Sequence, residues 1–171
     1  MKGQQKKYEL TGEFIEHWSG KKLYRIRALV SFGVVVAGQL GGFVESEKNL
    51  DQSLSGNAWV YGNARVYGNA WVYGDAWVYG DARVYGDARV RSYAVISERK
   101  MIFWASNVGS ENGTLTVFNG KDGLIVTRGC FTGAVDEFLA KSAEVHDDKT
   151  KNEYKLLIEV AKSRILGAKD E

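Results

Sequence analysis

The sequence predicts a mainly β protein whose centre is a triangular coil of short strands, and three observations support this. Six hexads follow one another without a break: NAWVYG, NARVYG, NAWVYG, DAWVYG, DARVYG and DARVRS. Inside each hexad small or aliphatic residues alternate with large ones, which is the period of a strand with one buried face. Gly-Asn or Gly-Asp follows each of the first five strands, and these residues tolerate the positive φ of a sharp corner. Three strands and three corners complete one coil, so equivalent positions recur every third hexad.

The alternation assigns an inward and an outward set of side chains. The alanine and valine of each hexad are expected to fill the interior: Ala58, Val60, Ala64, Val66, Ala70, Val72, Ala76, Val78, Ala82, Val84, Ala88 and Val90. Outward residues 18 positions apart should lie directly above one another. Face one then stacks Trp59 on Trp77 and Tyr61 on Tyr79, face two stacks Arg65 on Arg83 and Tyr67 on Tyr85, and face three stacks Trp71 on Arg89 and Tyr73 on Arg91.

The hexads resemble the left-handed parallel β-helix of hexapeptide-repeat proteins. That family places an aliphatic residue at the first repeat position and a small residue four positions later, as in Val60 with Ala64. The resemblance covers residues 34–97, and it alone implies the left hand of the coil. The wider chain is similar to hexapeptide-repeat proteins encoded in bacteriophage and prophage genomes, through VAGQLGGFVES at 36–46 and VTRGCFTG at 126–133. This similarity implies a phage or prophage accessory protein.

The flanking segments are expected to form an N-terminal hairpin cap over residues 1–33 and a small C-terminal α+β module over residues 98–171. The hairpin is predicted because two alternating stretches flank a Trp-Ser-Gly turn at 18–20, and an open coil end needs cover for its strand edges. The module should contain strands at 100–105, 114–119 and 123–128, a helix capped by Thr132 and running to about Val145, and a second helix at 152–166.

Composition excludes several classes of function. Two His and one Cys rule out a zinc cage, a disulfide framework and the three-histidine metal site of the γ-type carbonic anhydrases, so no metal or cofactor is expected. The net charge of +2 lacks the basic excess of a duplex nucleic-acid binder. Because the sequence shows neither a secretory h-region nor a membrane span, we expect a cytoplasmic protein, in the host cytoplasm if it is phage-encoded. Cys130 is expected to be a buried structural residue.

The aromatic residues on the outside of the coil need an explanation, because a large exposed apolar patch usually marks an interface. We expect an oligomer contact, with cover by the C-terminal helices as the alternative. Hexapeptide-repeat proteins commonly form trimers about a threefold axis, so the resemblance favours a trimer. The predicted interface residues are Trp59, Tyr61, Trp71, Trp77 and Tyr79.

The arginine and tyrosine residues suggest a second kind of surface. A guanidinium binds an anion while a neighbouring ring stacks on a base, a combination that suits a nucleotide-like ligand. The alternative is that these side chains only contact one another through cation–π interactions and solubilise the face. The predicted ligand-binding residues are Arg65, Tyr67, Arg83, Tyr85, Arg89 and Arg91.

Three functions follow from these surfaces. The first is a non-catalytic phage accessory protein that sequesters a nucleotide-like host signalling molecule or blocks a host defence component. The second is a structural or oligomerisation module. The third is an acyl-CoA-dependent acyltransferase, an activity of this fold family that relies on a histidine base. No hexad contains a histidine, which leaves only His17 and His146 for that role.

Overall fold

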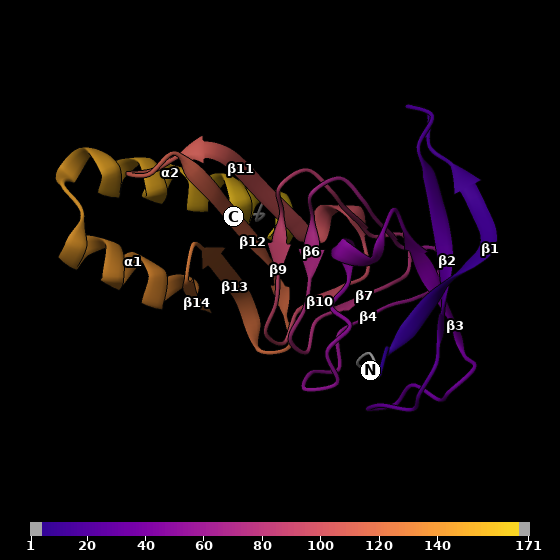
Figure 1. Cartoon of the computed structure of the whole chain (residues 1–171). Helices are drawn as coiled ribbons and strands as arrows, with labels where there is room; N and C mark the ends of the chain where they lie inside the picture. Colours follow the sequence, from indigo (N-terminus) through magenta and orange to yellow (C-terminus); the bar gives the residue numbers. More distant parts are fainter. Residues whose placement is uncertain (1–4, 168–171) are drawn as a thin grey trace.

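The structure is a computed structural model that describes residues 5–167, and it is mainly β with a small helical part at the C-terminal end. Figure 1 shows the N-terminal hairpin at one end of the molecule and the short strands of the hexads in the middle. The C-terminal sheet follows, and the two helices lie at the opposite end. The candidate surfaces therefore lie between two terminal structures that both contact the central coil.

Each hexad forms one short strand, and strands that lie three hexads apart in the sequence pair in parallel. The strands are β4 (Trp59–Val60), β5 (Arg65–Val66), β6 (Trp71–Val72), β7 (Trp77–Val78), β8 (Arg83–Val84) and β9 (Arg89–Val90). β4 pairs with β7, β5 with β8 and β6 with β9. β10 (Val95–Ile96) then pairs with β7 at the same interval. The chain thus visits three sheets in turn, which confirms the predicted solenoid repeat of three hexads per coil.

The interior of the coil is built from the predicted alanine and valine residues. All of them, from Ala58 to Val90, are completely buried and belong to one core cluster. Burying a valine side chain contributes about 1.5–3 kcal/mol relative to leaving it exposed. The corner glycines Gly62, Gly68, Gly74, Gly80 and Gly86 have φ between 61° and 71°. This conformation explains why glycine recurs at each corner, since other residues adopt it only with strain.

The N-terminal hairpin joins the sheet of face two. β1 (Tyr8–Glu16) pairs antiparallel with β2 (Lys22–Ala28), and β2 pairs antiparallel with β3 (Leu40–Val44). β3 then pairs in parallel with β5, which gives the sheet order β1-β2-β3-β5-β8. The predicted hairpin is therefore present, and it extends a coil sheet through β3. β8 is the last strand of this sheet.

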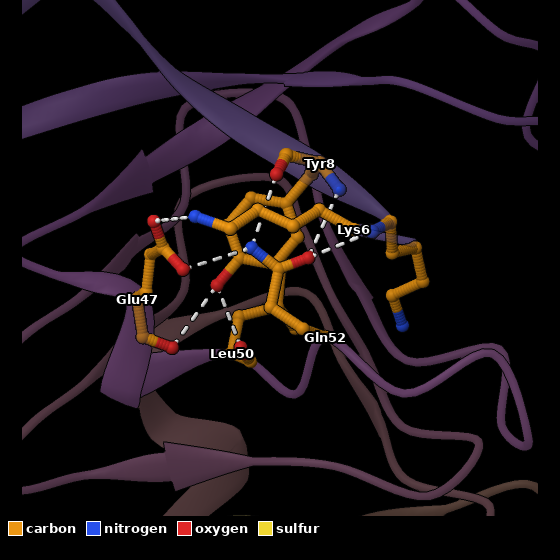
Figure 2. A network of polar contacts seen from close by, with 6 residues as sticks. Lys6, Tyr8, Glu47, Leu50 and Gln52 are labelled. Atoms are coloured by element: carbon orange, nitrogen blue, oxygen red, sulfur yellow. Dashed lines mark hydrogen bonds and ion pairs between the residues drawn. The ribbon is translucent and has the colours of Figure 1, made fainter. Parts of the chain in front are cut away.

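A polar network attaches the start of β1 and the residues before it to the first coil (Figure 2). Gln52 Oε1 accepts hydrogen bonds from the amides of Lys7 at 2.8 Å and Tyr8 at 3.1 Å, and Gln52 Nε2 donates to the Tyr8 carbonyl at 3.0 Å. The Tyr8 hydroxyl donates to the Leu50 carbonyl at 2.6 Å. The Gln52 side chain therefore pairs with the Lys7 and Tyr8 amides and the Tyr8 carbonyl, as a neighbouring strand would. The segment that carries Leu50 and Gln52 also makes the first coil longer than the later ones. Leu50 pairs with Val72, which is further along the chain than the three hexads that separate the later pairs.

The C-terminal part is a four-stranded antiparallel sheet covered by two helices. After the short 3-10 helix η2 (Arg99–Met101), the sheet order is β11-β12-β13-β14, with bounds Ile102–Val108, Gly113–Gly120, Gly123–Arg128 and Phe131–Ala134. The helices are α1 (Val135–Val145) and α2 (Asp148–Leu166). Along β12, Leu115 and Val117 join the core beneath the helices, whereas Phe118 joins the coil core. The sheet therefore separates the last coil from the helices.

Across residues 5–167, no helix has both the length and the apolar character to span a membrane.

Two expectations for this region are wrong. Thr132 does not cap a helix, because it lies in β14 and pairs with Thr127. Gly129, at φ 57°, allows a tight turn that folds Phe131–Ala134 back onto β13 as a strand. The helix then begins at Val135, where the Glu137 carboxylate accepts a hydrogen bond from the Ala134 amide at 2.8 Å. The same turn places Cys130 on the surface, so the cysteine is exposed and not a core residue.

Candidate ligand-binding site

Face two brings its arginines and tyrosines together as the repeat predicts. Arg65 lies beside Arg83 in the parallel register of β5 and β8. The rings of Tyr67 and Tyr85 stack with centroids 5.0 Å apart and planes 4° from parallel. Two cationic side chains and two stacked rings therefore run side by side along this face.

A pocket of about 170 Å³ opens beside β8 at the end of this face, lined by Arg83, Tyr85, Arg99, Ile102, Phe103, Trp104 and Arg164. These residues come from β8 and the residue after it, from η2 and β11, and from the last turn of α2. Trp104 stands edge-on to Tyr85, with ring centroids 4.7 Å apart and planes at 88°. It reaches this position over Gly86, where a Cβ atom would lie 2.8 Å from Trp104 Nε1. Glycine is thus required at position 86 for two reasons: the corner has a positive φ, and a side chain there would collide with Trp104.

The pocket is strongly cationic. A guanidinium stays protonated at any physiological pH, so Arg83, Arg99 and Arg164 bring three fixed positive charges. Among the described residues, no carboxylate lines the pocket or lies within 4 Å of these guanidinium groups. Arginines of the hairpin differ, since Arg25 contacts Glu13 at 3.0 Å and Arg27 contacts Glu9 at 2.6 Å. The pocket charge is therefore left for a ligand or for solvent ions to balance.

The Tyr67 hydroxyl lies within the field of these charges. Burial of the ring raises the pKa of Tyr67, and the neighbouring Tyr85 raises it further. The positive charges of Arg83, Arg99 and Arg65 lower the same pKa, because they favour the phenolate. Three arginines that are far apart in the sequence thus act on one hydroxyl.

Tyr67 itself is not an accessible ligand-binding residue, which corrects the prediction for it. Its side chain is only 8% exposed and packs in a cluster with Leu23 and Phe43. The His17 ring covers it, with centroids 4.7 Å apart. The physical reason is that the end of the hairpin folds over this part of face two. Tyr85, by contrast, is 38% exposed and borders the pocket.

Arg91 is also engaged within the chain, so its predicted role as a ligand contact is corrected. It donates hydrogen bonds to the carbonyls of Gly129 at 3.1 Å and Phe131 at 2.5 Å, and to the hydroxyls of Tyr73 and Thr132. These contacts use its guanidinium donors to hold the turn before β14. Arg91 therefore attaches the C-terminal sheet to the coil.

Arg89 lies apart from the other predicted residues, in a different pocket of about 350 Å³. Asp87, Glu111 and Arg128 line the same pocket. Two acidic and two basic side chains balance there, which distinguishes this pocket from the cationic one beside β8. Of the six predicted ligand-binding residues, only Arg83 and Tyr85 line the cationic pocket, and Arg65 lies next to them.

Face one carries an apolar groove of about 610 Å³, lined by Gly33, Val34, Asn57, Asp75, Trp77, Tyr79, Tyr93, Ala94, Val95 and Lys121. Tyr61 stacks on Tyr79 with centroids 4.7 Å apart, beside this groove. The groove agrees in position with the predicted interface residues Trp77 and Tyr79. The C-terminal helices pack on their own sheet, as described above.

Trp59 and Trp71 do not share this groove. Trp59 is 1% exposed and is covered by Phe32, 5.3 Å away, and Tyr8, 6.3 Å away between ring centroids. The expectation that it forms an oligomer contact is corrected, because the residues around β1 already bury it. Trp71 lies on face three, where its ring stacks on Tyr73 at 3.9 Å and Arg89 lies 5.8 Å from its centroid.

Neither histidine lines the cationic pocket. His17 Nδ1 lies 2.7 Å from Ser19 Oγ after β1, and His146 Nδ1 lies 2.9 Å from Ser142 Oγ after α1. Five pocket residues were not predicted from the sequence: Arg99, Ile102, Phe103, Trp104 and Arg164. They lie outside the repeats, so no period connects them with Arg83 and Tyr85.

Comparison with known families supports the repeat. The family model described as the YdcK beta solenoid repeat matches residues 58–74 and 64–80, within the hexads. A search of curated proteins gives no match. The central hexads are thus similar to a known β-solenoid repeat, and the matched residues carry the alternation and corners on which the fold prediction rests.

Proposed function

We propose that this is a non-catalytic binding protein for an anionic ligand that carries a planar group, as nucleotides do. One observation carries the proposal: Arg83, Arg99 and Arg164 surround a pocket without a carboxylate, and Tyr85 and Trp104 border it. A hydrogen bond to a charged group contributes about 1.5–3 kcal/mol, and stacking of a base on an aromatic ring about 1–3 kcal/mol. The two contacts together discriminate a nucleotide from a free anion or a free base.

The proposal includes the finer features that the resemblance implies. The solenoid is a left-handed parallel β-helix, and the protein is a phage or prophage accessory protein acting in the host cytoplasm. There it sequesters a nucleotide-like host signalling molecule or blocks a host defence component. The segments at 36–46 and 126–133 support the phage origin, and the cationic pocket supports a small anionic ligand over a protein target.

Binding of nucleotides to purified protein tests the proposal. We expect nucleotides to raise the melting temperature at moderate salt, and Arg83→Ala to weaken binding at least tenfold in calorimetry. Arg27→Ala is the matched control, because Arg27 lies in the hairpin and pairs with Glu9. If no nucleotide binds, or if Arg83→Ala binds as tightly as the wild type, the proposal is wrong.

The groove on face one favours a second role as an oligomerisation module. Its mainly apolar lining includes Trp77, Tyr79 and Tyr93, with Val34 and Tyr93 exposed by 72% and 58%. Self-association about a threefold axis would bury these side chains. The two roles are compatible, since the groove and the cationic pocket use different sheets of the coil.

A further inference from the structure

The open edge of β8 adds backbone donors to the cationic pocket. In every earlier coil the amides of the outward residues donate to the next coil, as that of Arg65 does to the Ala82 carbonyl at 3.1 Å and that of Tyr67 to the Val84 carbonyl at 3.0 Å. β8 has no strand beyond it. Within residues 5–167, the amides of Arg83 and Tyr85 consequently have no hydrogen-bond acceptor. Unpaired N–H groups at a sheet edge can donate to an anion. The Arg83 carbonyl shares this edge with them, as the Arg89 carbonyl does with the Arg89 amide on face three.

The edge of the coil on face three is closed by the protein itself. On face three, Thr116 Oγ1 accepts a hydrogen bond from the Arg89 amide at 3.2 Å, and Thr127 Oγ1 donates to the Arg89 carbonyl at 2.8 Å. Both threonines come from the C-terminal sheet and are buried. Face two receives no such hydroxyl among the described residues, and the segment that passes β8 carries Arg99 and Trp104 instead. The donors on this face are left for a ligand.

The size of the pocket limits what part of a ligand enters it. A volume of about 170 Å³ holds about six water molecules at their share of liquid volume. A phosphate group fits this space, which is smaller than the roughly 300–1,000 Å³ of pockets that enclose a drug-sized ligand. With the phosphate inside, the planar group of a nucleotide would lie at the mouth, where Tyr85 is 38% exposed and Trp104 stands beside it.

The charge of the pocket selects among phosphates. A phosphomonoester carries about −1.5 to −2 charges at pH 7, because its second pKa is about 6. A phosphodiester has only one ionisable oxygen and carries a single negative charge. Three arginines without carboxylate partners therefore favour the monoester, and two amides supply further donors to its oxygens.

We propose that the ligand is a phosphomonoester whose terminal phosphate enters the pocket beside β8 while its planar group stacks at the mouth. This inference rests on the proposed function and names the ligand class for the same site. It places nucleoside 5′-monophosphates, and other molecules with a planar group and a free terminal phosphate, ahead of cyclic and internal phosphodiesters.

Calorimetric titrations of the full chain with 5′-AMP, 3′,5′-cyclic AMP, adenosine and inorganic phosphate test the inference. We expect 5′-AMP to bind at least tenfold more tightly than the cyclic nucleotide, and more tightly than adenosine or phosphate alone. Equal or tighter binding of cyclic AMP would overturn the phosphomonoester inference and leave the proposed nucleotide binding intact. Failure of both nucleotides to bind would overturn both.

Variants separate the phosphate contacts from the stacking contacts. Arg164→Gln and Arg99→Gln should weaken 5′-AMP binding at least tenfold and bring it close to that of cyclic AMP, with an unchanged melting temperature. Tyr85→Leu should weaken 5′-AMP binding without changing the weak binding of inorganic phosphate. Arg27→Gln is the control for net charge. A uniform loss for both nucleotides in the arginine variants would contradict a pocket that selects the terminal phosphate.

Discussion

At the scale of single residues, Lys7 is the least expected feature of the molecule. Its side chain is fully buried, Nζ donates to the Ala58 carbonyl at 2.8 Å, and it lies 4.8 Å from the centroid of the Phe32 ring. Burial lowers the pKa of Lys7 to about 8, while the charges of Asp51 and Asp75 partly oppose the shift. In the sequence it looks like one more basic residue of a charged N-terminal segment.

This lysine predicts an unusual dependence of stability on pH. Between about pH 8 and pH 10 the unfolded chain holds a proton on Lys7 that the folded chain has released, so the free energy of unfolding rises with pH. Above about pH 10 the raised pKa of Tyr8 acts in the opposite direction, because the folded chain then holds the extra proton. Urea unfolding at pH 7.5, 8.5 and 9.5 should show the rise in the wild type and lose it in Lys7→Met. An equal rise in the variant would exclude Lys7 as its cause.

At the scale of elements, the attachment of the C-terminal sheet depends on Arg91. Arg91→Ala removes four hydrogen bonds, two of them to backbone carbonyls of the turn before β14. Hydrogen bonds to a charged group contribute about 1.5–3 kcal/mol, so we expect destabilisation of that size in urea unfolding. Arg89→Ala is the control and should change stability by less than about 0.5 kcal/mol, as surface substitutions usually do. If the two variants lose equal stability, Arg91 has no special role in attachment.

Elements built on the repeat were predictable, and those outside it were less so. The parallel pairs of the hexads follow from a strict period, because each residue repeats the environment of its equivalent three hexads away. β14 was missed because Phe131–Ala134 has only four residues, one of them a glycine, and its pairing depends on the turn at Gly129. The hairpin at 8–28 was predicted, but its connection to the coil through β3 depends on contacts between distant segments.

At the scale of the whole molecule, face one carries the prediction of self-association. Trp77→Ala removes the largest half-buried ring of the groove, and we expect it to convert a trimer into monomers in light scattering while the fold remains. Trp59→Ala should behave differently. This ring is buried in the core, so the variant should lose about 3–5 kcal/mol of stability, as deletions of a buried aromatic side chain do.

An exposed apolar residue elsewhere provides the control for this experiment. Leu156 on α2 is 53% exposed and does not line the groove, so Leu156→Ala should leave the assembly unchanged. A wild-type protein that is monomeric at all concentrations would refute the oligomer proposal. Dissociation by Leu156→Ala and not by Trp77→Ala would move the interface to the helices.

The sequence by itself determined the coil, its interior and its three outward stacks, because a local period of one hexad repeats one backbone geometry and one packing problem. Only the tertiary structure decided which outward residues remain accessible. The hairpin covers Tyr67, Tyr8 of β1 and Phe32 cover Trp59, and the turn before β14 engages Arg91. The cationic pocket is likewise a feature that only the tertiary structure decided. It joins Arg83 to Arg99 and Arg164, and such a juxtaposition depends on long-range packing that no local pattern encodes.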